Sequence, residues 1–288
     1  MTVPFHGAGA YPDVPELNYH TGRFGPEEGS LSSTEAKRLL ESPATYQWYK
    51  THPQPPSRAF DIGHIVHSMV LGVGLDVVTY PEEVLGKGGA TTTMAAKQFA
   101  AEARKNGQIP VKTSELEVPS LMAEAVLNHP TARKYFENGV PELSIYTKDD
   151  GVWMRGRIDW IHHTLETPVL IDLKTTAATP TPDSFTRTVA NFHYALQREW
   201  YRHIWYEITG EWAPFMHVVV SKTPPYLVGV FEFDSEFELI GKTQMRRALT
   251  TYRACMERDE WPGLPEATSL IGPPTWYANQ ELDESEML

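Results

Sequence analysis

Residues 170–176 read Leu-Ile-Asp-Leu-Lys-Thr-Thr, and residues 156–160 shortly before them read Gly-Arg-Ile-Asp-Trp. Both stretches are rich in apolar or β-branched side chains and a Thr-Pro pair lies between them, so the sequence predicts two neighbouring strands of a sheet. Side chains alternate across a strand, which places Asp172 and Lys174 on one face and the apolar residues on the other. One face of this strand therefore belongs to the core, and the other carries an acid and an amine.

The earlier stretch supplies a second carboxylate to the same region. Asp159 shares a strand face with Arg157, and from that face it can meet Asp172 across the sheet. Two carboxylates brought together repel each other unless a positive group lies between them. A hard divalent cation such as Mg²⁺ fits, because it takes oxygen ligands and keeps waters that can attack a substrate. The alternative is a surface ion pair between Asp172 and Lys174, and the apolar residues around both acids count against it.

The order Asp159, a gap, then Asp172-x-Lys174 resembles the core motif of PD-(D/E)xK nucleases. The run Ile-Asp-Leu-Lys-Thr-Thr is similar to the RecB-like and RecE-like branches, and over residues 31–258 the resemblance is nearest to RecE-like phage exonucleases. It implies an α/β fold with a central mixed β-sheet flanked by helices, that is, a restriction-endonuclease-like core with an N-terminal helical elaboration.

Two residues before the Asp strand match the acidic and metal-binding positions of this family. Gly63 and His67 lie one turn apart on a helix predicted at residues 60–71, which resembles the Gly-x-x-x-His pattern whose histidine binds metal. Glu142 stands where the family has a further acid. The alternatives are a histidine satisfied in the core, which is the commoner case on an apolar helix face, and an exposed glutamate at a strand start.

A helix predicted at residues 193–208 carries a third match. Tyr194, Gln197 and Tyr201 form one helical stripe, which resembles the Tyr-x-x-Gln-x-x-x-Tyr motif that follows the Lys strand. Such a stripe is by default a packing face, but an amide within it needs a polar partner. We expect Gln197 to lie near the scissile phosphate or the lysine, and Arg157 and the two tyrosines to contact the DNA backbone or to pack in the core.

The resemblance also implies roles in hydrolysis. His67, Asp159, Asp172 and the backbone carbonyl of Leu173 would hold Mg²⁺, and the histidine among oxygen ligands also suits Mn²⁺. Lys174 would place the attacking water and offset charge on the phosphoryl group. Glu142 would help to bind a second metal or orient water. Gln197 would position the lysine or the phosphate.

Length and composition indicate one elaborated domain. We expect an extended arm at residues 1–30, the nuclease domain at 31–258 and a tail at 259–288 of the 288-residue chain. The single cysteine, Cys255, excludes a four-cysteine iron–sulfur cluster built from one chain. No apolar run approaches the roughly 18 residues of a membrane helix, so we expect no membrane contact and a soluble, cytoplasmic protein, in the host cytoplasm if a phage encodes it.

The formal net charge of −12 is unusual for a nucleic-acid enzyme, because phosphate binding normally depends on lysine and arginine. Acids neutralised by metal and an acidic tail leave room for a local basic groove. The tail acids are Glu281, Asp283, Glu284 and Glu286. We therefore expect DNA binding to depend on divalent metal and to fall steeply with salt.

The elements around the site follow from local patterns. Ser32 to Glu35 form a capping-box pattern that predicts a helix start, and further helices are expected at residues 91–106, 113–128 and 235–258. Strands are expected at residues 109–111, 215–221 and 226–233. Residues 180–191 are expected to form caps and turns.

The family resemblance implies a metal-dependent exonuclease that degrades one strand of duplex DNA from the 5′ end and leaves a 3′ overhang for recombination. By analogy its partners are double-stranded DNA ends, a RecT-like single-strand annealing protein and further copies of the chain in a ring. Two alternatives stay open: a RecB-like or Cas4-like nuclease acting on single strands, and a non-catalytic DNA-binding or assembly protein on a nuclease-like scaffold.

Overall fold

The structure, a computed structural model, describes residues 4–52, 58–275 and 279. Its strands are β1 (Gly9–Tyr11), β2 (Leu31–Ser32), β3 (Asp76–Thr79), β4 (Gln108–Val111), β5 (Gly139–Asp149), β6 (Val152–His162), β7 (Val169–Thr176), β8 (Phe215–Ser221) and β9 (Val228–Glu232). Its α-helices are α1 (Glu16–His20), α2 (Ser33–Glu41), α3 (Pro43–Thr51), α4 (Arg58–Leu71), α5 (Met94–Lys105), α6 (Glu117–Asn128), α7 (Ala132–Phe136), α8 (Pro182–Asn191), α9 (Tyr194–Thr209) and α10 (Ser235–Arg258).

A mixed sheet forms the centre of the molecule. Its strand order is β1-β5-β6-β7-β8-β9, and β2 pairs with β6 off this path. The β7–β8 and β2–β6 pairs are parallel, whereas the other pairs are antiparallel. The parallel β7–β8 pair needs a long crossover, and α8 and α9 supply it. The predicted α/β fold with a central mixed sheet flanked by helices is confirmed.

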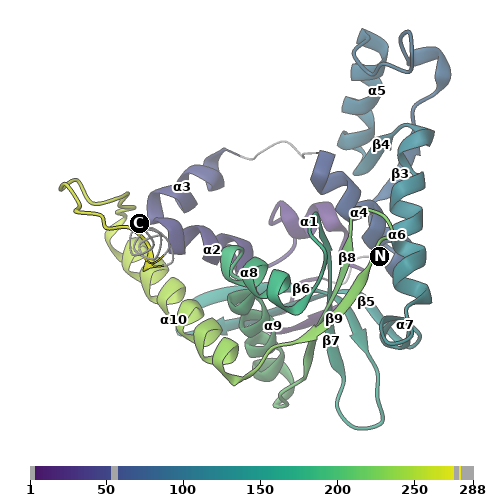
Figure 1. Ribbon diagram of the computed structural model, residues 1–288. Helices are drawn as coiled ribbons and strands as arrows, with labels where there is room; N and C mark the ends of the chain where they lie inside the picture. The colour runs from purple at the N-terminus through teal and green to yellow at the C-terminus, as the bar shows by residue number, and fades with distance from the viewer. Residues whose placement is uncertain (1–3, 53–57, 276–278, 280–288) are drawn as a thin grey trace, which may run out of the picture.

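Helices cover both faces of the sheet (Figure 1). On one face Leu196, Trp200 and Ile204 of α9 pack with Leu170 of β7, in a cluster that also takes in α2 and α10. On the other face α4, α6 and α7 pack against alternate side chains of β7 and β8, namely Ile171, Leu173, Val218 and Val220. The side-chain alternation predicted for β7 therefore holds, and Asp172 belongs to the α9 side.

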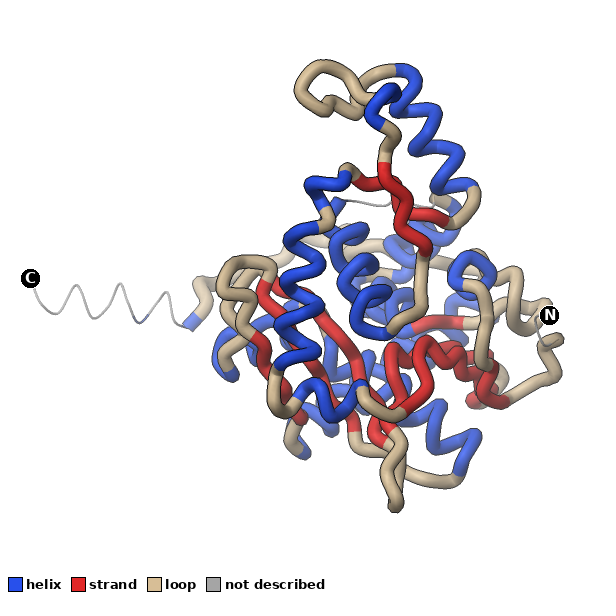
Figure 2. The backbone as a smooth tube through the Cα atoms, turned by 90° about the vertical axis from the view of Figure 1, so that its right-hand side faces the viewer, coloured by secondary structure: helices blue, strands red, loops and turns tan. Residues whose placement is uncertain are grey.

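A small arm projects from this body (Figures 1 and 2). It consists of α5 and the parallel pair β3–β4, and its own small core contains Ile109 and Val111 together with Ile65 of α4. The predicted helix and the short strand in this region are confirmed. None of the helices in the described part of the chain is long and apolar enough to cross a membrane.

The N-terminal segment differs from the extended arm that we expected. Its strand β1 pairs antiparallel with β5, and Tyr11, Val14, Tyr19 and Phe24 form a buried cluster around Tyr146 of β5. Gly- and Pro-rich sequence hides this because the segment is ordered by packing on the sheet and by its aromatic side chains, not by a helical or strand periodicity of its own. The segment is part of the domain.

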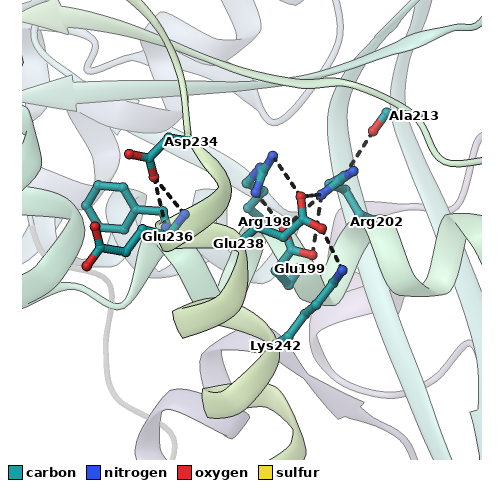
Figure 3. Close-up of polar contacts among 9 residues, drawn as sticks. Arg198, Glu199, Arg202, Ala213, Asp234, Glu236, Glu238 and Lys242 are labelled. Carbon is teal, nitrogen blue, oxygen red and sulfur yellow. Dashed lines mark hydrogen bonds and ion pairs between the residues drawn. The ribbon is translucent and has the colours of Figure 1, made fainter.

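A buried network of charges joins α9 to α10 (Figure 3). Glu199, 1% exposed, accepts hydrogen bonds from Arg198 at 2.7 Å and from Arg202 at 3.1 Å. Arg202 also donates to Glu238 on α10 at 2.9 Å, and Lys242 donates to the other oxygen of Glu238 at 2.6 Å. Each buried charge thus has an opposite charge beside it, which offsets the cost of taking it out of water.

Sequence patterns at helix starts predicted some helices correctly and missed one. The capping box at Ser32 and Glu35 is present, since each side chain bonds the other residue's backbone amide, and α10 spans the predicted residues. Residues 182–191, expected as caps and turns, are instead the helix α8, capped by Thr181. The acidic tail residues after position 280 lie outside the described residues.

Candidate active site

The site lies where β6 and β7 separate. Their ladder ends at the pair Trp160–Ile171, and one step further the same register sets Asp159 opposite Asp172. At this point the backbone amide of Leu173 donates a 2.7 Å hydrogen bond to the side chain of Asp159, at Oδ2, and the regular β6–β7 pairing has ended. The strands therefore open into a fork whose two inner residues are the predicted acids.

Three of the predicted residues converge on one spot. His67, Glu142 and Asp159 each offer a ligand atom, and these atoms all lie within 4.8 Å of one another. His67 Nε2 donates to the Leu173 carbonyl at 2.7 Å, which leaves Nδ1 to face Asp159 Oδ2 at 3.7 Å. The Leu173 carbonyl, expected as a metal ligand, here fixes the ring of His67, which is a common way to orient a ligating histidine.

Glu142 reaches this spot through an unusual backbone. It stands in the β5 position that the register sets opposite Asp159, and its φ of 50° is in the left-handed region that non-glycine residues rarely adopt. Arg157 Nε holds its carboxylate at 2.7 Å. Burial and the nearby Asp159 nevertheless raise the pKa of Glu142 to about 7. A negative charge on both acids is therefore costly, and a cation between them would relieve the cost.

Asp172 is held by one donor from its own strand and one from α9. Lys174 Nζ donates to Asp172 Oδ1 at 2.6 Å, and Gln197 Nε2 of α9 donates to the same oxygen at 2.8 Å. Burial would raise the pKa of Asp172, but the charge of Lys174 and its hydrogen bond lower it below its ordinary value. Asp172 is therefore not one of the three converging residues, and its role in the structure is to anchor the lysine beside them.

A second lysine, which the sequence did not single out, continues this chain of contacts. Lys37 of α2 donates to Gln197 Oε1 at 3.0 Å, so the amide of Gln197 has its oxygen toward Lys37 and its nitrogen toward Asp172. The ring of Tyr194 lies 4.9 Å from Lys37 Nζ and 5.4 Å from Lys174 Nζ. The contact with Lys37 spans 160 positions, so only its place near a helix start was visible in the sequence.

His217 is the other residue that the sequence did not reveal. It pairs directly with Asp172 across β7 and β8, it is fully buried, and its Nε2 lies 4.0 Å from Asp172 Oδ2. Its ring stacks on Phe233 at 4.3 Å between centroids. Burial lowers the pKa of His217 to about 3, so the ring is neutral and can donate a proton to only one neighbour.

The predicted DNA contacts turn out to be engaged within the protein. Arg157, besides holding Glu142, donates to the carbonyl of Val14 in the N-terminal segment at 2.6 Å. Tyr201 is buried, and its ring leaves no room for a side chain on Gly156 of β6, where an added Cβ would lie 2.8 Å from it. Of the two tyrosines in the stripe, Tyr194 borders the two lysines of the site, and the buried Tyr201 lies against Gln197.

The residues present fit a divalent cation. An imidazole nitrogen and two carboxylates from three separate elements form a donor set that suits Mg²⁺ or Mn²⁺. Asp172 Oδ2, beside them, is a buried carboxylate oxygen without a hydrogen-bond partner among the described residues. An unsatisfied buried oxygen of this kind calls for a positive partner or a water.

Comparison with known proteins gives a family and a fold. The model of a family described as "PDDEXK-like domain of unknown function (DUF3799)" matches residues 32–271. The crystal structure of a "putative exonuclease" from Eubacterium rectale superposes with a TM-score of 0.61 at 14% identity, covering 92% of this chain and 97% of that one. The crystal structure of SSO0001 gives a TM-score of 0.34 at 14% identity, covering 83% and 82%. No curated protein matches the sequence.

Proposed function

Because the chain belongs to the PDDEXK-like family whose model covers residues 32–271, and therefore carries a nuclease-type core, we propose that it is a divalent-metal-dependent exonuclease of duplex DNA. We propose further that it acts from the 5′ end and leaves a 3′ overhang, which is a substrate for recombination. The ring of subunits and the annealing partner inferred from the RecE-like resemblance remain predictions.

One observation carries this proposal: His67, Glu142 and Asp159, from three different elements, offer ligand atoms within 4.8 Å of one another, next to an amine fixed by a buried carboxylate. An ordinary surface ion pair, the alternative for Asp172 and Lys174, does not account for this. Asp172 is only 1% exposed, and burying it costs free energy that a surface pair would not. A divalent cation bound by the three residues would supply charge stabilisation at the phosphate and a more acidic water.

The chain's own residues give the rest of the chemistry. Lys174 keeps its proton, because Asp172 and Asp159 raise its pKa although burial alone would lower it. A protonated amine held at 2.6 Å by Asp172 can orient a nucleophilic water and offset the charge that builds on the phosphoryl oxygens. Gln197, fixed from both ends by Lys37 and Asp172, keeps that carboxylate in place. Pre-set groups of this kind lose little freedom during the reaction.

The test is a hydrolysis assay with Mg²⁺ on duplexes labelled at either the 5′ or the 3′ end, with a single-stranded oligonucleotide in parallel. We expect nucleotides to be released from the 5′ end of the duplex. Lys174→Ala and Asp172→Ala should each lower the rate by about 100-fold or more, with an unchanged circular-dichroism spectrum. The exposed Lys134 of α7 provides the control, Lys134→Ala, which should act as the wild type.

Each other outcome points elsewhere. Faster loss of the single strand would favour the RecB-like alternative. DNA that binds but is not cut with Mg²⁺ or Mn²⁺ would favour the non-catalytic one, and normal cleavage by Lys174→Ala would contradict the proposed chemistry.

A further inference from the structure

Lys37 is the least compensated charge at the site. Its ammonium group reaches from α2 toward α9 and makes a 3.0 Å hydrogen bond to the neutral amide oxygen of Gln197. Across the described residues, no carboxylate lies within ion-pair distance of Lys37 Nζ, whereas Lys174 on the same tyrosine ring has Asp172 at 2.6 Å. An ammonium has three donors, so two of those on Lys37 have no hydrogen-bond acceptor among the described residues.

The pKa values of the two lysines are shifted in opposite directions, because only Lys174 has a carboxylate beside it. Burial, followed by the nearby charge of Lys174, lowers the pKa of Lys37 to about 7. The carboxylates of Asp172 and Asp159 outweigh burial at Lys174 and raise its pKa above the ordinary value. A protein that keeps a desolvated cation without an anion pays for it in stability. A ligand that brings the anion can recover this free energy on binding.

We propose that Lys37 binds a backbone phosphate of the DNA strand, adjacent to the phosphate that Lys174 addresses. The inference rests on the proposed function, since it assumes a DNA strand in the site. The two remaining donors of Lys37 can form hydrogen bonds to phosphate oxygens. A lysine ammonium binds phosphate as a compact charge and does not need the fixed bidentate geometry of an arginine. The ring of Tyr194 lies 4.9 Å from Lys37 Nζ and 5.4 Å from Lys174 Nζ, so the two ammonium groups border one ring and can address neighbouring phosphates of one strand.

The rival account is that Lys37 only orients the amide of Gln197. Two substitutions separate the accounts. Lys37→Met removes both the charge and the hydrogen bond, whereas Lys37→Gln removes the charge but retains an N–H donor for Gln197 Oε1. Lys37→Arg retains both. Lys134→Met removes the same charge from an exposed residue of α7, so it controls for the change in net charge.

The experiment measures DNA binding at a series of salt concentrations, with Ca²⁺ in place of Mg²⁺ to slow hydrolysis. The slope of log K against log salt reports the phosphates neutralised, at about 0.9 for each contact on duplex DNA. We expect the slope to fall by about 0.9 in both Lys37→Met and Lys37→Gln, with weaker binding to every sequence tested. Lys37→Arg and Lys134→Met should keep the wild-type slope.

An unchanged slope in both Lys37→Met and Lys37→Gln would overturn the proposal. So would wild-type binding by Lys37→Gln combined with a lower turnover of Lys37→Met, because that pattern is the orienting role alone. Thermal melting of each variant shows that it is folded, and if Lys37→Met is not, the pair Lys37→Gln and Lys37→Arg still decides. Failure here leaves the proposed function intact, since cleavage by the wild type is tested separately.

Discussion

Asp172 receives more of the site's polar contacts than any neighbouring acid. Lys174 and Gln197 both donate to its Oδ1, and His217 Nε2 lies 4.0 Å from its Oδ2. A carboxylate fixed by donors from β7 and α9 cannot rotate freely, so the amine that it holds is fixed as well. The position of Lys174 relative to the three converging ligands therefore depends on Asp172 and Gln197.

At the same scale, Lys37 should make stability depend on pH in a defined direction. Its pKa is about 7 in the folded chain and 10.5 in the unfolded one, so between these values the unfolded chain holds a proton that the folded chain has released. The free energy of unfolding therefore rises with pH through this window. Below pH 7 the folded chain bears the full cost of burying the protonated Lys37. The groups facing Lys37 are Asp172 and Lys174 of β7, Gln197 and Tyr194 of α9, His193 before α9, and His217 of β8.

We therefore compare the free energy of unfolding of Lys37→Met with that of the wild type at pH 6 and at pH 9. The variant's advantage over the wild type should be larger at pH 6, by about 1–3 kcal/mol. Urea unfolding of both proteins in EDTA at the two pH values measures it. Lys134→Met, on an exposed residue, should show the same difference from wild type at both pH values. A Lys37→Met effect that does not vary with pH would mean that the ammonium is not penalised in the folded chain.

The sequence revealed the acids, the lysine and Gln197, but not Lys37 or His217. Asp159, Asp172 and Lys174 stand in a short motif whose strand alternation can be read locally. Lys37 and His217 reach the same place from α2 and β8, and such long-range contacts leave no local pattern. The sequence also does not show that Asp172 bonds Lys174 and Gln197 instead of joining the group of His67, Glu142 and Asp159.

Among the elements, α9 and α10 are held together by charges as well as by apolar contacts. Glu199 lies between Arg198 and Arg202 and is 1% exposed. Removing one partner of a buried pair leaves the others uncompensated. We expect Glu199→Gln to lower the free energy of unfolding by about 3–5 kcal/mol, whereas Glu236→Gln on the exposed face of α10 should change it by less than about 0.5 kcal/mol. Equal effects in urea unfolding would show that the network does not stabilise the helix pair.

The same helices approach so closely that only glycine fits between them. A Cβ on Gly241 of α10 would lie 2.3 Å from the carbonyl oxygen of Ala195 and 2.7 Å from a side-chain carbon of Glu199 on α9. In an exposed helix, Gly→Ala stabilises by about 1 kcal/mol. Here we expect Gly241→Ala to destabilise by about 1–3 kcal/mol, because α10 must move away.

Thermal melting shows whether Gly241→Ala raises or lowers the stability of the protein. The control is Thr243→Ala, two residues further on the exposed side of α10. A stabilised Gly241→Ala protein would contradict the close approach.

Elements with a strong local signal were predicted well, and those ordered by their surroundings were not. The cap at Ser32, the apolar stripe of α9 and the long α10 follow from periodicity and start signals. The strand β1 and the helix α1 are only three and five residues long, and they form because the edge of β5 and the ring of Tyr146 accept them. The helix α8 was taken for turns because Pro and Thr at its start read equally as a turn or as a cap.

At the scale of the whole molecule, the N-terminal segment packs beside the site and contacts residues that border it. Glu16 of α1 lies 3.1 Å from His64 of α4, one turn before His67, and the carbonyl of Val14 holds Arg157. Tyr19 packs under both Arg157 and Arg155, with the guanidinium carbons 5.3 and 5.7 Å from the centre of its ring. The segment therefore positions the arginine that holds Glu142.

We expect Tyr19→Ala to cost about 3–5 kcal/mol of stability, as for a buried aromatic residue of a core. Leu17→Ala, on the same short helix but 41% exposed, should cost less than about 1 kcal/mol. Urea unfolding of the two variants compares a buried and an exposed position of α1. If Tyr19→Ala were as stable as Leu17→Ala, the segment would contribute little to the core, as the sequence predicts for an extended arm.

The central claim is that His67, Glu142 and Asp159 bind one divalent cation. The most direct measurement is a crystal structure with Mn²⁺, in which anomalous scattering locates the ion. The account predicts a single strong peak within about 2.5 Å of an imidazole nitrogen of His67 and of a carboxylate oxygen of both Glu142 and Asp159. A peak bound elsewhere, or none at millimolar Mn²⁺, would contradict it.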